Sequence, residues 1–166
     1  MNRNLPVALC LMLMSGLLPS SGFADGVVLG NPDHAAMLQS KDPKAAANKR
    51  VVYDFWRIVV EAGHLDEMAR LTTAGYIQHN PNFVSGRQNL IDMFAKSGRK
   101  LVPIEERVKT PIVAILAEGD LVSISFVREL PDPKDPTKKY TTTNLALFRV
   151  ENGKLAEHWD PAFKNN

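Results

Sequence analysis

The change in hydrophobic period near residue 100 is the feature that most constrains the fold of this chain. Before it, apolar residues recur every three or four positions, which is typical of amphipathic helices. After it, apolar and polar residues alternate in segments separated by turn sequences, which is typical of antiparallel strands. The pair Asn152-Gly153 is the strongest hairpin signal in the chain. The pattern predicts helices first and an antiparallel meander after them.

Three helices are expected in the first half, with one short strand embedded among them. Asp42 and Pro43 provide an N-cap and a first-turn proline for the first helix. A capping-box sequence at Ser85 begins the third helix, and a glycine ends it. The expected elements are helices at Ala45 to Ala62, at His64 to Leu71 and at Ser85 to Gly98, and a strand within Tyr76 to Pro81.

Four strands are expected in the second half. The loop from Pro131 to Pro136 carries three prolines and cannot be strand, so it separates the second expected strand from the third. The expected strands are Ile104 to Ala117, Leu121 to Leu130, Tyr140 to Val150 and Leu155 to Phe163.

The first 24 residues have the organisation of a secretory signal. Arg3 supplies a positive start, Val7 to Leu18 is apolar, and small residues precede Asp25. We therefore expect a signal peptide over residues 1–24, a linker or arm over 25–43, one domain over 44–166, and a periplasmic or secreted protein. An uncleaved membrane anchor is the alternative, but the apolar run is short for a bilayer span.

Composition excludes several classes of function. The single cysteine, Cys10, lies in the expected signal, so the mature chain would contain no disulfide, thiolate metal site or cysteine nucleophile. The 20 Lys and Arg and 18 Asp and Glu of the full sequence are interspersed, so no nucleic-acid or membrane partner is expected after signal cleavage. The four histidines lack metal-binding spacing, and no metal site is expected.

The last expected strand carries the best candidate for acid/base chemistry. Because strand side chains alternate, His158 and Asp160 share one face, and Glu157 and Trp159 share the other. A histidine and a carboxylate on one face could transfer protons, and burial would raise the pKa of the aspartate towards a useful value. The structural alternative is a solvated sheet edge.

The run from Tyr76 to Pro81 is a second candidate. Regular alternation places Tyr76, Gln78 and Asn80 on one face and His79 on the other, although the following proline can twist this assignment. The first three could hydrogen-bond a ligand, whereas His79 is either a catalytic imidazole or a turn residue bonded to nearby backbone. Further candidates for ligand contact are Tyr53, Trp56 and Phe83, for which the alternative is a place in the core.

Three segments together resemble the SnoaL-like branch of the nuclear-transport-factor-2-like superfamily: Tyr76 to Pro81, Gly86-Arg87, and Phe148 to Asp160. The resemblance covers Ala45 to Phe163. It implies an α+β cone, in which three helices pack against a strongly curved antiparallel sheet and enclose an apolar pocket. It also implies that a homodimer formed through the sheet is common.

The resemblance also implies a kind of chemistry. SnoaL-like polyketide cyclases close rings by an intramolecular aldol reaction without a cofactor, with an aspartate as general acid/base and a histidine nearby. Asp160 best matches that aspartate, and His79 and His158 are the available imidazoles. Related ketosteroid isomerases place their catalytic aspartate where this chain has Asn80, which cannot abstract a proton.

The expected function is therefore cofactor-free proton transfer on a small hydrophobic carbonyl compound, as in an aldol, isomerase or lyase reaction, with Asp160 as the central group. Members of this superfamily also include proteins that only bind ligands or assemble. A non-catalytic ligand-binding or dimerisation module is the alternative.

Overall fold

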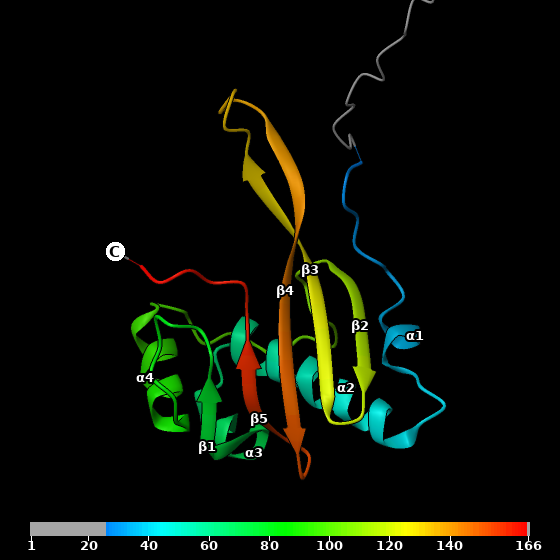
Figure 1. The fold of residues 1–166 in the computed structure, drawn as a ribbon, viewed down its shortest axis with the longest axis vertical. Coiled ribbons are helices and arrows are strands. Elements are labelled where there is room, and N and C mark those ends of the chain that lie inside the picture. The colour runs from blue at the N-terminus through cyan, green and yellow to red at the C-terminus, as the bar shows by residue number, and fades with distance from the viewer. Residues whose placement is uncertain (1–25, 166) are drawn as a thin grey trace, which may run out of the picture.

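A five-stranded sheet in the order β1-β5-β4-β3-β2 forms one layer of the fold (Figure 1). Strands β2 to β5 form an antiparallel meander, as the sequence predicts, whereas β1 pairs parallel with β5. The sheet is therefore antiparallel except at this one edge. The strands are β1 (Thr72–Gln78), β2 (Ile112–Glu118), β3 (Leu121–Pro131), β4 (Lys139–Glu151) and β5 (Lys154–Trp159).

The computed structural model describes residues 26–165. The expected signal peptide, residues 1–24, lies outside the described residues. Within the described part of the chain, no helix is both long enough and apolar enough to cross a membrane.

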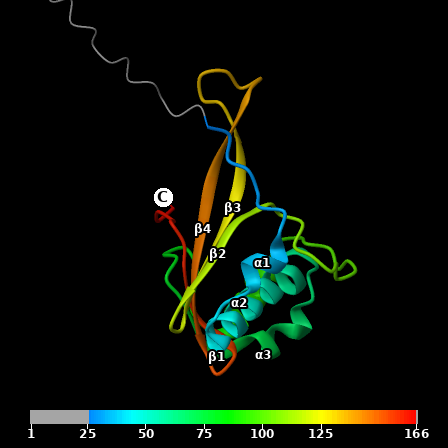
Figure 2. The same ribbon diagram turned by 90° about the vertical axis from the view of Figure 1, so that its right-hand side faces the viewer.

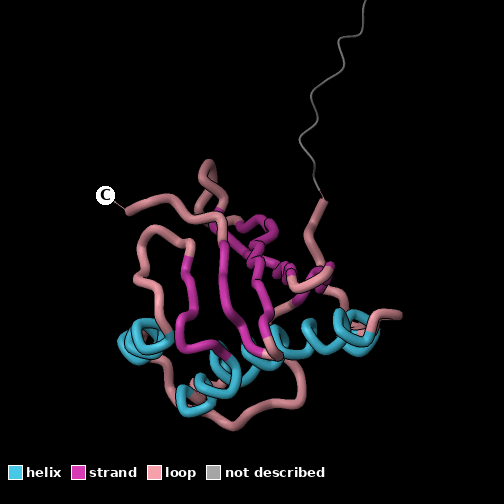
Figure 3. The backbone as a smooth tube through the Cα atoms, turned by 60° about the horizontal axis from the view of Figure 1, so that its bottom comes forward, coloured by secondary structure: helices cyan, strands magenta, loops and turns pink. Residues whose placement is uncertain are grey.

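Helices form the second layer and gather on one side of the sheet (Figures 2 and 3). The first expected helix is α2, capped by Asp42, which accepts from the Lys44 N–H at 2.9 Å; the π-helix η1 continues it. A short helix, α1, lies in the segment expected as an arm and buries Met37 and Leu38. The helical elements are α1 (His34–Leu38), α2 (Pro43–Phe55), η1 (Trp56–Glu61), η2 (Leu65–Glu67), α3 (Met68–Leu71) and α4 (Arg87–Lys96).

The core fills the space between α2 with η1 and the inner face of the sheet. Apolar residues of the helix at spacings of three and four meet inward-facing residues of β3 and β4, and this burial supplies most of the driving force for the fold. Fully or almost fully buried members of the cluster include Val52, Phe55, Val59, Ile124 and Phe148.

Several element boundaries differ from the expectation, among them the end of β5, which lies at Trp159 and not at Phe163. Strand β1 starts at Thr72, before the predicted Tyr76, and β2 starts only at Ile112, because residues 101–111 are loop. Ser85 does not cap α4, which starts at Arg87 after Gly86 with φ of 105°. The Ser85 hydroxyl instead accepts from the Gln78 N–H at 3.0 Å and so ties the loop before α4 to the end of β1.

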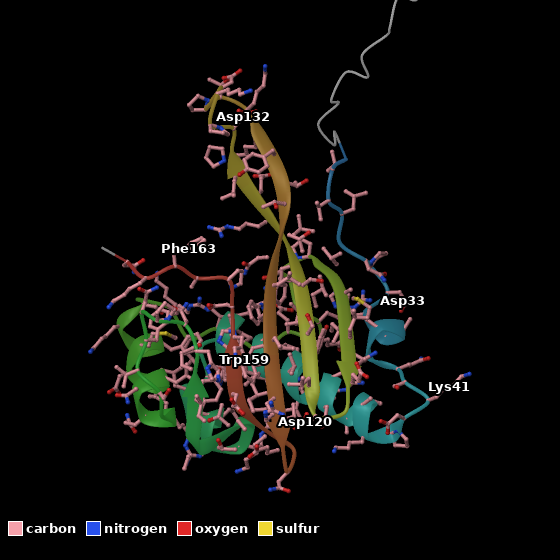
Figure 4. All side chains as sticks on the ribbon, viewed as in Figure 1. Asp33, Lys41, Asp120, Asp132, Trp159 and Phe163 are labelled. Atoms are coloured by element: carbon pink, nitrogen blue, oxygen red, sulfur yellow. The ribbon has the colours of Figure 1, made fainter. Side chains whose placement is uncertain are left out.

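Beyond the part of the sheet covered by helices, β3 and β4 continue as a twisted two-stranded arm (Figure 1). The proline-containing loop predicted from Pro131 to Pro136 lies at its tip, where Figure 4 labels Asp132. The prediction is wrong for Pro131 itself, which is the last residue of β3 and pairs with Lys139 of β4.

Candidate functional site

A cavity of about 800 Å³ opens between the helices and the inner face of the sheet. Its walls include the aromatic residues Phe55, Phe94 and Phe148. Polar side chains from β1 and from the end of β5 meet at one part of the wall, namely Tyr76, Gln78, His158 and Asp160. Small-molecule sites in proteins combine apolar walls with a few converging polar groups in this way.

Asp160 is held in the cavity wall by Asn80. The side-chain amide of Asn80 donates to both carboxylate oxygens of Asp160, at 2.9 and 3.0 Å. The side-chain oxygen Oδ1 of Asn80 accepts from the Asn82 backbone N–H at 3.0 Å and from the Asn82 side-chain amide at 3.1 Å. Asn80 is 6% exposed. It was predicted to bind substrate, but its amide is already engaged, so its role in the structure is to position Asp160.

His158 is held by Gln78. The Oε1 atom of Gln78 accepts from the Asn80 backbone N–H at 3.1 Å, so it is an acceptor, and His158 Nδ1 at 3.0 Å must donate to it. In the neutral ring this leaves Nε2 unprotonated. The ring stacks on Phe148 with centroids 4.6 Å apart. Burial lowers the pKa of His158 to about 4, so the imidazole is neutral at pH 7.

Tyr76 supplies a hydroxyl group at the same end of the cavity. Its side chain is almost completely buried. Burial, reinforced by the negative charge of Asp160, raises the pKa of this phenol far above its usual value. The hydroxyl therefore remains protonated and can act as a hydrogen-bond donor.

The sequence profile of the SnoaL-like domain matches residues 52–158, which span β1, β5 and most of the cavity wall. The chain belongs to the SnoaL-like domain family. This confirms the resemblance found in the sequence. No curated protein matches the chain.

Solved structures show the same fold. One is described as a SnoaL-like polyketide cyclase from Jannaschia sp. CCS1; it is 20% identical, with a TM-score of 0.50, and the match covers 74% of this chain and 91% of that one. Another is an LEH-like epoxide hydrolase from M. tuberculosis, 16% identical with a TM-score of 0.51, matched over 71% of this chain and 84% of that one. At these identities the likeness concerns the fold alone.

The SnoaL-like domain places His79 away from the cavity. His79 follows β1 on the face opposite Tyr76 and Gln78, where its Nε2 lies 2.8 Å from Glu157 Oε2 and its ring stacks on Trp159 with centroids 4.4 Å apart. The expected assistance of Asp160 by His79 therefore needs correction, because the alternation of the strands sends the two side chains to opposite faces of the sheet.

The face opposite the cavity, which we call the outer face, carries a chain of ionic contacts between strands. Arg149 of β4 donates to Glu157 at 2.7 Å and to Asp120, in the turn between β2 and β3, at 2.6 Å. The hydrogen bond from His79, followed by that from Arg149, holds the pKa of Glu157 below its usual value. Figure 4 labels Trp159 and Asp120 of this region. These contacts connect strands and contribute no group to the cavity.

The aromatic candidates divide into two groups. Trp56 and Phe83 line the cavity of the SnoaL-like domain, and their contact with a ligand stays a prediction. Tyr53 is instead buried in the core, where its hydroxyl accepts from the Val108 N–H at 2.9 Å and is bonded to His34 Nδ1 at 2.8 Å. Tyr53 was predicted to contact substrate, but in the structure its hydroxyl joins α1, α2 and the loop before β2.

Helix α4 contributes cavity residues that the sequence analysis did not single out. It was interpreted only as a core helix, yet Asp92, Met93 and Lys96 line the cavity, together with Arg99 just beyond it. The sequence did contain a signal for this: the polar residues Asp92 and Lys96 lie one turn apart on a helix whose apolar stripe is narrow. Among the described residues, no group of three or more His, Cys, Asp or Glu side chains is arranged to hold a metal ion.

Proposed function

We propose that this SnoaL-like domain catalyses cofactor-free proton transfer on a small, largely apolar carbonyl compound. The observation that carries the proposal is that Asp160 and His158 line one cavity and are each fixed by a side-chain amide from residues 78–80. A preorganised carboxylate beside a neutral imidazole and a protonated phenol is a set suited to acid/base catalysis.

Each polar group has a defined part in the proposed reaction. The Asp160 carboxylate removes a proton from the carbon next to the carbonyl, and the electron pair of that C–H bond moves into the carbonyl to form an enolate. The Tyr76 hydroxyl donates a hydrogen bond to the enolate oxygen. His158 Nε2 accepts a hydrogen bond from a hydroxyl group of the substrate. The enolate then takes the proton back from Asp160 at another carbon, or it attacks a second carbonyl, whose oxygen receives the electron pair of the C=O bond and takes the proton from Asp160.

The apolar walls serve the same chemistry. Phe55, Phe94 and Phe148 exclude water from a bound substrate, and hydrogen bonds to a developing charge are stronger where water is excluded. The proposed substrate is therefore mainly hydrocarbon, with its carbonyl directed to the Asp160 end.

A test of this proposal does not require the natural substrate. The purified protein is incubated in D₂O with a panel of hydrophobic ketones, and deuterium entry next to the carbonyl is followed by NMR. Native mass spectrometry of the protein purified from its source adds any retained ligand to the panel. Exchange above the buffer rate for at least one compound is expected. Absence of exchange for the retained ligand would leave the alternative, a module that binds without catalysis.

We also propose a homodimer formed through the outer face of the sheet. Strand pairing aligns Leu116, Ser123, Leu147 and Trp159 in one row across the sheet, and Leu116 is 66% exposed. Large apolar side chains gathered on an exposed sheet face are typical of a surface that another protein covers.

Export remains a proposal based on the sequence of residues 1–24. We propose that the mature protein is periplasmic or secreted and begins at Asp25. N-terminal sequencing of the protein recovered from its source tests this, and a start at Met1 would contradict it.

A further inference from the structure

We infer that the ligand of this cavity carries an anionic group, such as a carboxylate, which lies where the end of α4 approaches η1. The inference rests on the proposed function in placing the reacting carbonyl at the Asp160 end. It adds the class of substrate, an elongated hydrophobic keto acid.

Two cationic side chains line this part of the cavity without a carboxylate partner. They are Lys96, the last residue of α4, and Arg99. Among residues 26–165, no carboxylate lies within ion-pair distance of either. Asp92 lies one turn before Lys96 but accepts from the Gln88 amide at 2.9 Å instead. A ligand anion would supply the missing partner.

Arg99 is fixed against the cavity wall. Its guanidinium lies over the Phe94 ring, 5.2 Å from the centroid, and donates to the backbone carbonyl of Val60. A guanidinium has five N–H donors, so most of them remain for a ligand. Because the group is already held by the ring and the carbonyl, less rotamer freedom is lost when it binds an anion.

The indole N–H of Trp56 is a further donor without a partner in the same region. Nε1 is buried and has no hydrogen-bond acceptor within residues 26–165, while the ring lines the cavity and stacks on Phe126 with centroids 4.0 Å apart. Trp56 begins η1 and lies four residues before Val60, whose carbonyl holds Arg99. Single π-helical turns within α-helices frequently occur at functional sites. Lys96, Arg99 and Trp56 are thus three cavity-lining residues with hydrogen-bond donors that the protein itself does not fully satisfy.

The anionic group and the carbonyl would bind at separate places. Trp56 packs on Phe126 of β3, whereas Asp160 directly follows β5, and β4 lies between these strands. Two interstrand spacings of about 4.8 Å separate the two ends by about 10 Å. A cavity of about 800 Å³ with aromatic walls between the ends accommodates a ligand of that length.

Binding of decanoate and of decanamide tests the inference, since the two probes share a chain and differ in charge. Affinities are measured by calorimetry and by Trp56 fluorescence in a Trp159→Phe background, where Trp56 is the remaining tryptophan. We expect decanoate to bind about tenfold more tightly than decanamide. The double variant Lys96→Gln, Arg99→Gln should lose this preference. Lys100→Gln, which changes an exposed lysine that does not line the cavity, should keep it.

Equal affinities in the wild type, retention of the preference in the double variant, or no binding of either probe would overturn the inference. The readout is independent of catalysis. Asp160→Asn should lose deuterium exchange and keep the preference for decanoate. If the wild type prefers decanoate but catalyses no deuterium exchange, the proposed function is wrong and the anionic subsite stands. If it catalyses exchange but does not prefer decanoate, the anionic subsite is wrong and the proposed function stands.

Discussion

The side chain of Asn80 donates to both carboxylate oxygens of Asp160, and the two residues lie 80 positions apart in the sequence. The contact joins the end of the parallel edge strand β1 to the residue after β5. The Asn80 amide thus holds the Asp160 carboxylate at the cavity wall. The pairing of β1 with β5 is therefore what assembles the site.

Replacing Asn80 by alanine should separate positioning from binding. Asn80→Ala leaves a partly buried carboxylate without its donor, so we expect a loss of about 1–3 kcal/mol in the free energy of unfolding. The rate of deuterium exchange should fall through kcat more than through KM, because Asp160 is no longer held in place. Urea denaturation and exchange kinetics measure these effects. Asn144→Ala, which removes another amide from the cavity wall, should change kcat little; an equal fall in both variants would contradict the positioning role.

The pH dependence of stability should report the burial of His158. The unfolded chain takes up a proton below a pH of about 6.5, whereas folded His158 does so only near its lowered pKa of about 4. The stabilising contribution of the neutral ring is thus complete above pH 6.5 and is lost as the pH falls through this window.

The contribution of neutral His158 to the free energy of unfolding should fall by up to about 3 kcal/mol between pH 7 and pH 4 in the wild type, and this fall should be absent for His158→Gln. Urea denaturation of both proteins between pH 4 and pH 7 measures the free energy of unfolding at each pH. Subtracting the values for the variant from those for the wild type cancels the contribution of other titrating groups such as Glu157. Parallel stability curves for the two proteins would show that the ring is not buried as described.

His79 should be dispensable for proton transfer. His79→Ala removes the contact with Glu157 and the stack on Trp159, and since both lie on the outer face, the exchange rate should stay within about twofold of the wild type. The free energy of unfolding should fall by no more than about 1 kcal/mol. A large loss of exchange with stability retained would return His79 to the mechanism.

The sequence predicted the local parts of this site well. Alternation in β5 placed His158 and Asp160 on one face and Glu157 with Trp159 on the other, and the structure has the same arrangement. Alternation in β1 likewise directed Tyr76 to the inside. The face on which a strand side chain lies depends only on the alternation along that strand, so it can be read from the residues next to it in the sequence.

The parts that could not be predicted depend on contacts between distant segments. Nothing local to Asn80 indicates that β1 pairs parallel with β5, and so its amide was assigned to substrate. Tyr53 and Trp56 have the same helical pattern, yet one bonds Val108 in the core and the other lines the cavity. Ser85 begins a capping-box sequence, but its hydroxyl accepts a hydrogen bond from the Gln78 backbone N–H instead of capping α4.

Substitution of Leu116 on the outer face of the sheet should disrupt the proposed homodimer without affecting the cavity. Leu116→Lys places a charge where the proposed dimer buries a leucine, so light scattering after size exclusion should shift from dimer to monomer. Leu29→Lys, at a comparably exposed leucine outside the sheet, should leave the dimer intact. A wild-type protein that is monomeric at high concentration would remove the proposal.

The central claim is that Asp160 is the base of a proton-transfer site. The most direct measurement compares deuterium exchange into the most reactive ketone by the wild type, Asp160→Asn and Asp92→Asn, the last of which neutralises another carboxylate in the same cavity wall. We expect Asp160→Asn to lower the rate by at least about 100-fold with the fold intact, whereas Asp92→Asn should stay near the wild type. Equal rates for the wild type and Asp160→Asn would contradict the claim.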